Sequence, residues 1–352
     1  MSNQINDTDN SISQLSMQVQ KIIGFPRQPG DIGGPSSFQS RLERKLIETG
    51  CKVTYPKDNI HPDVILVVNS TSKILWVLLS KLRGSRIVHR LDGLFWRSEA
   101  LDNVSLSIKL KHKVLDLFKF FIRNFLADEV VYQSEFIKDW WHKKYGKASC
   151  RENIIYNGAD LEEFYPREKD TTSLPRILCV EGYVQDDIVT LKTLTEASTK
   201  LASSKLIEET WVCGEISQDS QKYISRFSEI SIRGKVPRDE MSKCFSIYGI
   251  YLVLEINPPC PNSVIEALAS GMPVVGFDTG ALRELVPPNA GVLVPYDGNP
   301  WKLEEPNFEL ISEAIAQVLT DWHAFSKGAR ETAEQKFSLD TMFLKYRKLL
   351  GV

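Results

Sequence analysis

The sequence predicts an α/β protein with two doubly wound domains that face each other across a cleft. Short apolar runs alternate with amphipathic stretches, and each run is apolar on both faces, as buried parallel strands are. The pattern restarts after a polar segment bounded by prolines, residues 166–176, which is a linker candidate. The length of 352 residues leaves room for two domains of ordinary size.

Each half contains six expected strands. Those of the first half are 21–25, 52–56, 64–69, 86–92, 129–133 and 153–157, with helices between them such as 36–49 and 135–145. Those of the second half are 176–182, 210–214, 230–236, 249–255, 273–279 and 291–296. The chain is expected to begin with a disordered tail, residues 1–20, followed by an N-terminal domain, residues 21–168. A C-terminal domain, residues 169–330, and a final helical segment, residues 331–352, are expected to follow.

Composition excludes several classes of protein. A formal net charge of -2 argues against broad electrostatic binding of nucleic acid. Six scattered cysteines without a CxxC pair argue against a metal knuckle or a disulfide framework, and suit a reducing cytoplasm. No apolar stretch is long enough to span a bilayer, and the first twenty residues lack the features of a signal peptide.

Two glycines stand in the loop after the first expected strand. Gly33 and Gly34 precede Pro35, which suits the first position of a helix. Tandem glycines at a helix N-terminus let backbone N–H groups approach an anion. The loop is either a phosphate-binding turn or an ordinary tight turn from strand to helix, and the residues favour neither.

Asp92 ends the fourth expected strand, in the stretch HRLDG. Asp92 would point into the cleft, with Arg90 and His89 alternating around it. A carboxylate there could hold sugar hydroxyls or stabilise developing positive charge. The alternative is an ordinary Asp–Gly turn.

The stretch CPNSVIEALASGMPVV, residues 260–275, predicts a loop, a short helix and a strand. Ser263 and Glu266 fit a capping box, in which the Glu266 carboxylate accepts from the backbone N–H of the cap. Glu266 could instead accept hydrogen bonds from ligand hydroxyls, with the helix N-terminus facing a phosphate. These residues alone favour the cap.

Gly280 follows the next expected strand, in FDTGALREL. A glycine at this edge of a sheet permits a close approach of the backbone. Glu284 lies early in the helix behind it, where a carboxylate suits the helix dipole.

Residues 105–125 form a basic amphipathic segment with a local charge of +4. Such a helix can lie on an anionic membrane surface. An ordinary helix with a solvated basic face and an apolar face toward the core is the alternative, and we favour it because the segment lies inside a domain. The charged residues are Lys109, Lys111, Lys113, Lys119 and Arg123, against Asp116.

Taken together, these pieces resemble glycosyltransferase family 4, the retaining nucleotide-sugar enzymes of GT-B fold, from about residue 21 to the C-terminus. The resemblance is carried by GGPSSFQSRLERKLIETG, VYQSEFIKDWW, IIYNGADLEEFYP and NSVIEALASGMPVVGFDTGALRELV. It implies that Glu266 holds the ribose of the nucleotide and that the backbone around Asn262 and Ser263 meets the sugar and diphosphate. It places Gly33 and Gly34 over the diphosphate. The other donor-binding candidates are Gly182 and Gly280.

The chain departs from the family pattern at several positions. The first Glu of the usual pair falls at Pro258, and Glu255 is three residues early; some members with a CPN segment share this loss. Tyr183 and Ile188 stand where an Arg and a Lys usually grip the diphosphate. Asp92 aligns with the usual His of the fourth strand.

The missing positive charge has three candidate sources in this sequence. They are Arg90, Arg97 and Arg238. Cations matter here because a departing diphosphate needs electrostatic stabilisation. Asp92 and Arg90 are the candidate catalytic residues.

The resemblance implies a retaining, metal-independent transfer of a sugar from a UDP- or GDP-sugar to a saccharide or glycolipid hydroxyl, in surface polysaccharide or glycoconjugate synthesis. No cofactor is implied, and no Asp-x-Asp motif occupies a cleft loop. The expected place is the cytoplasm, with contact to the inner membrane face through 105–125 left open. A final helix, about 330–350, is expected to cross back to the first domain.

Two other functions stay open. One is a catalytically impaired relative that acts as a binding or assembly subunit. The other is a different GT-B enzyme, such as a sugar-nucleotide epimerase or a phosphorylase.

Overall fold

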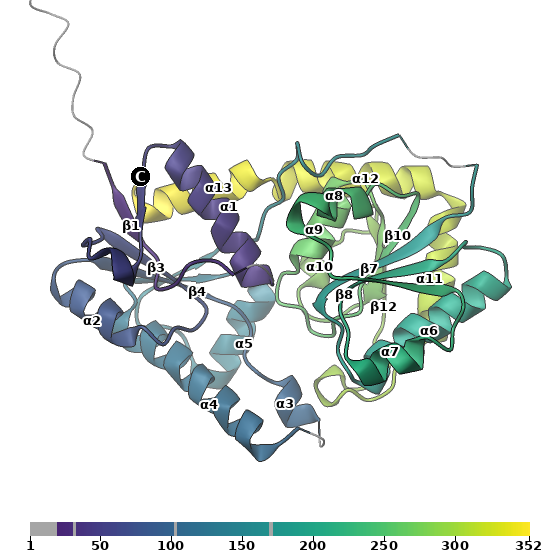
Figure 1. The fold of residues 1–352 in the computed structure, drawn as a ribbon, viewed down its shortest axis with the longest axis horizontal. Helices are drawn as coiled ribbons and strands as arrows, with labels where there is room; N and C mark the ends of the chain where they lie inside the picture. Colours follow the sequence, from purple (N-terminus) through teal and green to yellow (C-terminus); the bar gives the residue numbers. More distant parts are fainter. Residues whose placement is uncertain (1–19, 31–32, 102–103, 169–171) are drawn as a thin grey trace, which may run out of the picture.

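A computed structural model describes residues 20–30, 33–101, 104–168 and 172–352, so the predicted tail lies almost wholly outside the described residues. It contains two six-stranded sheets, each flanked by helices and each parallel throughout its described pairings (Figure 1). The predicted fold class is confirmed, and all twelve expected strands are present within a few residues of their expected bounds.

The N-terminal sheet has the strand order β2-β1-β3-β4-β5-β6. Its centre is hydrophobic because β3 buries all five of its apolar residues, so helices must cover both faces. The strands are β1 (Ile22–Gly24), β2 (Lys52–Thr54), β3 (Val64–Val68), β4 (Arg86–Leu91), β5 (Glu129–Tyr132) and β6 (Arg151–Ile154). The helices are α1 (Gly34–Glu48), α2 (Ile74–Leu82), α3 (Arg97–Ala100), α4 (Leu106–Phe121), its continuation η2 (Ile122–Leu126), and α5 (Glu135–Tyr145).

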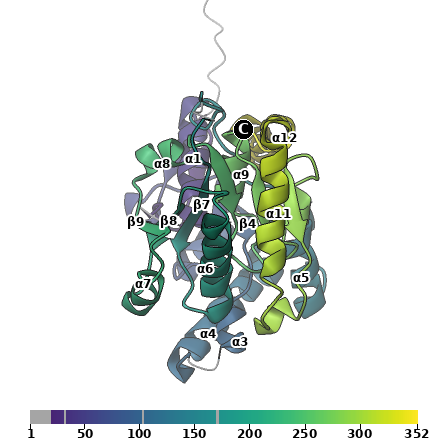
Figure 2. The ribbon, with the colours of Figure 1, turned by 90° about the vertical axis from the view of Figure 1, so that its right-hand side faces the viewer.

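The C-terminal sheet has the order β12-β11-β10-β7-β8-β9. Helices α6 and α11 lie side by side over one of its faces (Figure 2). The strands are β7 (Arg176–Tyr183), β8 (Thr210–Glu215), β9 (Ile230–Gly234), β10 (Gly249–Leu252), β11 (Val274–Phe277) and β12 (Gly291–Val294). The helices are α6 (Ile188–Ser203), α7 (Gln218–Ile224), α8 (Met241–Cys244), α9 (Asn262–Ala269), α10 (Leu282–Leu285), α11 (Glu309–Thr320) and α12 (Trp322–Lys336).

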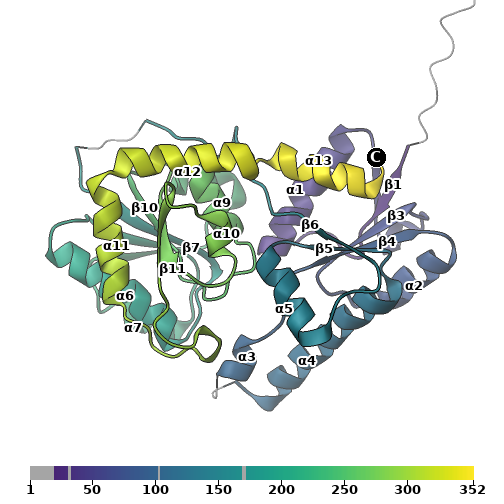
Figure 3. The ribbon, with the colours of Figure 1, turned by 180° about the vertical axis from the view of Figure 1, so that it is seen from behind.

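The end of the chain returns to the N-terminal domain (Figure 3). The expected single helix is two helices, α12 and α13 (Leu339–Leu350), because Ser338 starts a new helix by accepting a hydrogen bond from the Thr341 N–H. One face of α13 belongs to the same buried cluster as β1, β3 and α1. The rings of Tyr346 and Phe38 lie 5.2 Å apart, so α13 completes the N-terminal core.

Helix α4 differs from the favoured expectation. Its apolar side was expected to face the core, but its buried residues are Asp116 and Lys119, while large apolar side chains along it are exposed. No described helix is both long and apolar enough to cross a membrane.

Candidate functional site

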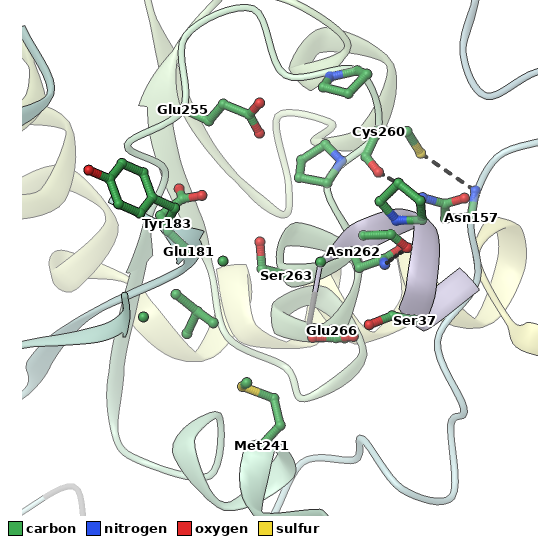
Figure 4. A pocket seen from close by; sticks show the side chains of 18 of the residues that line it. Ser37, Asn157, Glu181, Tyr183, Met241, Glu255, Cys260, Asn262, Ser263 and Glu266 are labelled. Atoms are coloured by element: carbon green, nitrogen blue, oxygen red, sulfur yellow. Dashed lines mark hydrogen bonds between the residues drawn. The ribbon is translucent and has the colours of Figure 1, made fainter. Parts of the chain in front are cut away.

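A cavity of about 390 Å³ lies between the two sheets, at the carboxyl ends of strands from both. Eight of the nine predicted donor-binding and catalytic residues line it: Gly33, Gly34, Arg90, Asp92, Gly182, Asn262, Ser263 and Glu266. Figure 4 shows Glu181, Tyr183 and Glu255 on one side of the pocket and Asn157, Cys260 and Asn262 on the other.

The glycine loop brings the start of α1 to the cavity. Gly33 has a φ of 99°, a conformation that favours glycine, and it immediately precedes the helix. Among the described residues, no side chain caps α1, so its first N–H groups remain available to an anion. Asn262 holds this end from the other domain by donating to the Gly34 carbonyl over 3.2 Å.

Glu266 does not form the expected capping box. Pro261 is the N-cap of α9, so Ser263 already lies inside the helix and no described side chain caps it. The Glu266 side chain is 8% exposed, and its carboxylate binds the guanidinium of Arg41 in α1, which also donates to the Gly158 carbonyl. Glu266 therefore links the two domains at the cavity wall.

Arg90 and Asp92 form a buried network. The Arg90 side chain is 1 % exposed, pairs with Asp92 and donates to Gln133 and Asn157 over 2.8 Å each. Its guanidinium also lies 4.0 Å from the centre of the Phe38 ring. Asp92 receives a second hydrogen bond from Gln133 at 3.0 Å. Because Asp92 neutralises its charge, Arg90 serves to position the side chains that it contacts.

Gly280 lies away from the cavity, where sequence reasoning placed a donor contact. It has a φ of 60°, and a Cβ there would come within 2.4 Å of the Pro258 backbone nitrogen. The N–H of the next residue, Ala281, donates to the Pro258 carbonyl. The close approach is thus between two loops of the protein, and it fixes the segment that leads into α9.

Two carboxyl groups that sequence reasoning did not propose as a pair, Glu181 and Glu255, line the cavity. Glu181 lies near the end of β7 and Glu255 follows β10, so adjacent parallel strands bring them to one edge. Burial, together with the negative charge of Glu255, raises the pKa of Glu181; burial also raises that of Glu255. Their spacing in sequence gives no local signal, since only the β7–β10 pairing joins them.

The cations near the cavity differ in what they already bind. Arg41 and Arg90 are buried and paired with carboxylates. Lys235 pairs with Glu215 at 2.8 Å, both half exposed. Arg238 is exposed and reaches across the cavity to the Ser37 hydroxyl in α1, at 3.3 Å. Among the described cations that line the cavity, Arg238 is therefore the one that existing contacts hold most weakly.

Arg97, another predicted source of positive charge, does not line the cavity, although its charge opposes the rise in the pKa of Glu181 and of Glu255. It forms an ion pair with Asp187, the residue that caps α6.

Tyr183 and Ile188 stand where the family pattern has an Arg and a Lys. Tyr183 lines the cavity and donates a hydrogen bond to Asp186. Ile188 is the first residue of α6 and is 45 % exposed.

Further contacts hold the two domains together around the cavity. The Glu284 carboxylate accepts from the backbone N–H groups of Glu135 and Phe136, capping α5 from the other domain. Trp301, in the turn η4 (Pro300–Lys302), packs among aromatic rings of α5 and of the segment before α3; its ring lies 4.8 Å from that of Trp140 and 5.3 Å from that of Trp96. Within the described ranges, no three His, Cys, Asp or Glu side chains gather as a metal site would require.

Comparisons with known proteins agree on the fold. Residues 175–321 match the family model described as "Glycosyl transferases group 1". Sucrose-phosphate synthase from Thermosynechococcus elongatus has a TM-score of 0.73 at 16% identity, over 94% of this chain and 99% of that one. A glycosyltransferase from Rickettsia africae ESF-5 has a TM-score of 0.71 at 16% identity, over 94% and 98%. HepE from Anabaena, in complex with UDP and glucose, has a TM-score of 0.66 at 14% identity, over 94% and 99%.

No curated protein sequence matches this chain. The structural likeness shows a GT-B architecture of two Rossmann-like domains, and the C-terminal one carries the group 1 glycosyltransferase match.

Proposed function

We propose that this protein is a glycosyltransferase that moves a sugar from a nucleotide diphosphate donor to a saccharide or glycolipid hydroxyl, with retention and without a metal. The observation that carries the proposal is the cavity wall where the start of α1, the start of α9 and Glu266 meet. Two uncapped helix N-termini favour an anion, and an adjacent carboxylate suits sugar hydroxyls. This wall includes part of the segment that matches the glycosyltransferase model.

The C-terminal domain would hold the nucleotide. Glu266 would accept hydrogen bonds from the ribose hydroxyls, while Arg41 fixes the orientation of its carboxylate. Ser263 and Asn262 lie at the start of α9, beside the expected position of the sugar and diphosphate. Because HepE was solved with UDP and with UDP-glucose, a UDP-sugar is the first donor to test, and a GDP-sugar the second.

The diphosphate would be stabilised differently from the family pattern. Its negative charge would meet the N–H groups that begin α1 and the guanidinium of Arg238, which would exchange Ser37 for a phosphate oxygen. Gly33, Gly34 and Gly182 line the same space, where a side chain would obstruct the ligand. Arg238 thus supplies the positive charge that Tyr183 and Ile188 lack.

The N-terminal domain would bind the acceptor. In the transfer, the bond between the anomeric carbon and the diphosphate oxygen breaks, and the acceptor oxygen bonds to the same face of the sugar. The acceptor proton passes to the departing diphosphate. Asp92 would face the developing positive charge on the sugar, and Arg90 would act as a positioning residue for Asp92. Closure around the cavity would exclude water.

The proposed setting is the cytoplasm, where scattered free cysteines remain reduced. The acceptor would belong to a surface polysaccharide or another glycoconjugate, at the inner face of the membrane when it is lipid-linked. A catalytically impaired subunit is the second candidate function, since two carboxyl groups, Glu181 and Glu255, line the cavity with Tyr183, which stands where a cation is usual.

Thermal stabilisation by ligands tests the proposal. UDP, GDP, ADP and their sugars are added to the wild type, to Glu266→Ala and to the control Glu162→Ala, whose side chain is exposed outside the cavity. A nucleotide that binds the folded state must raise the melting temperature. We expect a shift with one base, lost in Glu266→Ala and kept in Glu162→Ala, and sugar transfer to an acceptor by the wild type. No shift with any ligand in a folded sample would favour the impaired subunit.

A further inference from the structure

Helix α4 carries an apolar stripe on its outer side. Six apolar residues from Leu106 to Phe125 follow one another at spacings of 4, 4, 3, 4 and 4 residues. Such spacings place side chains on one side of a helix with 3.6 residues per turn; the last of the six lies in η2. All six side chains are exposed, from 39% at Phe121 to 84% at Leu106. The α4 stripe consists of Leu106, Leu110, Val114, Leu117, Phe121 and Phe125.

The inner side of α4 explains why the stripe faces out. Asp116 and Lys119 are buried and joined by a 3.0 Å ion pair. Asp116 accepts from the Phe95 N–H, and Lys119 donates to the Gly93 carbonyl. These bonds tie the polar side of the helix to the segment after β4. Turning the stripe inward would break these bonds and leave the Phe95 N–H and the Gly93 carbonyl without their partners on α4, which is costly when they are buried.

Lysines flank the α4 stripe. By helical position, Lys111 lies on one side of it and Lys109 and Lys113 on the other. The helix's one acidic residue, Asp116, is buried and paired, so the outer side of α4 offers apolar groups edged by positive charge. Helix α2, joined to η2 through Val77 and Ile122 in one buried cluster, adds exposed leucines nearby. They are Leu75, Leu79 and Leu82.

We propose that the α4 stripe docks on an anionic phospholipid surface, with the helix axis parallel to the membrane plane. Apolar side chains would enter the headgroup region while the flanking lysines meet lipid phosphates. A second copy of the chain fits less well, because face-to-face packing would bring lysines against lysines. Figures 1 and 3 place α4 on the opposite side of the N-terminal domain from α13, so docking leaves the core helices undisturbed.

The position of α4 would bring a contact between the two domains near the lipid. Helix α3 packs against α4 and against the turn η4 of the C-terminal domain, with Trp96 beside Trp301. A docked protein would therefore hold the contact of α3 with η4, one of the junctions between its two domains, within one short helix of the surface. Such docking needs only the exposed side chains of α4 and does not depend on the proposed reaction.

Vesicle flotation tests the inference on the full chain. The probes are vesicles of phosphatidylcholine alone and of phosphatidylcholine with phosphatidylglycerol. One variant reverses Lys109, Lys111 and Lys113 to Glu, and another replaces Leu106, Leu110 and Leu117 by Ser. The control reverses Lys222, Lys327 and Lys336, exposed on the C-terminal domain, with the same change in net charge.

We expect flotation with the anionic vesicles, weakened by salt, and about tenfold or greater loss of binding in both α4 variants but not in the control. Circular dichroism and the melting temperature would show that both variants fold, since the replaced side chains are outside the core. Absence of flotation by the folded wild type would overturn the inference. So would a wild-type dimer that the Leu variant converts to a monomer, because the stripe would then bind a second copy.

Discussion

Arg41 in α1 and Glu266 in α9 form an ion pair across the two domains, with side chains 10% and 8% exposed. Removing one partner of a buried pair leaves the other charge unsatisfied, at about 3–5 kcal/mol. We therefore expect Arg41→Ala to lower the free energy of unfolding by that order and to weaken nucleotide binding, because Glu266 loses its orientation. Denaturant titration and calorimetry measure the two effects.

Arg44 provides the matched control on the same helix. It pairs with Asp160 at the surface, and its side chain is 48% exposed, so Arg44→Ala should cost about 0–1 kcal/mol. Equal losses of stability in the two variants would contradict the role given to the Arg41–Glu266 pair.

The Glu181–Glu255 pair predicts a pH dependence. Burial first, and the charge of Glu255 second, raise the pKa of Glu181 to about 8 from an ordinary 4.5. Because the pKa is raised, folding takes up a proton at pH values between about 4.5 and about 8, so this group lowers the free energy of unfolding as pH rises through that range. Glu181→Gln should remove this pH-dependent loss of stability. The free energy of unfolding of the variant should therefore exceed that of the wild type by more at pH 8.5 than at pH 5.

Ionisation of Glu181 should also affect binding of the nucleotide-sugar donor. Above about pH 8 the ionised Glu181 carboxylate would add negative charge beside the diphosphate, so we expect severalfold weaker binding of the nucleotide sugar by the wild type than at pH 6.5. Calorimetry across this range on wild type and Glu181→Gln measures it. Parallel pH profiles for the two proteins would show that Glu181 is not the group responsible.

Arg238 is expected to bind the diphosphate. Loss of a charge-assisted hydrogen bond is worth about 1.5–3 kcal/mol, so Arg238→Ala should raise the Kd for the nucleotide diphosphate about tenfold to a hundredfold. Binding of the nucleoside, which has no phosphate, should change little. The control Arg233→Ala removes a nearby cation that stacks on Trp211 outside the cavity. If the two variants bind alike, another group neutralises the phosphates.

Gly280 is expected to matter for stability. A Cβ there meets the backbone of Asn257 and Pro258 at 2.4–2.6 Å, in a conformation that already disfavours a side chain. We expect Gly280→Ala to cost about 2 kcal/mol or more, by denaturant titration. Gly50 has a φ of 83° with no atom within 4 Å of a Cβ, so Gly50→Ala isolates the conformational cost of about 1 kcal/mol.

Short-range patterns predicted the fold well because buried parallel strands are apolar along their whole length, as in VILVV of β3. The glycine loop and the start of α9 were likewise predictable, since proline and glycine fix backbone conformation locally. The partner of Glu266 was not, because Arg41 is 225 positions away and only domain packing brings it near.

The outward turn of α4 was unpredictable for a similar reason. Its apolar residues fit either a core or a surface, and the choice depends on Asp116 and Lys119, whose partners lie in the segment after β4. Gly280 was assigned to a ligand because sequence shows that space is needed but not what fills it. The Glu181–Glu255 pair requires knowing that β7 and β10 are neighbours.

Helix α13 also determines the order in which the protein can mature during synthesis. The N-terminal sheet emerges from the ribosome first, yet its core includes Leu339, Met342, Phe343, Tyr346 and Leu350. Until those residues have been translated, the apolar side chains of β1, β3 and α1 that they cover lack part of their packing partners. The N-terminal half therefore cannot complete its core until the whole C-terminal half has been made.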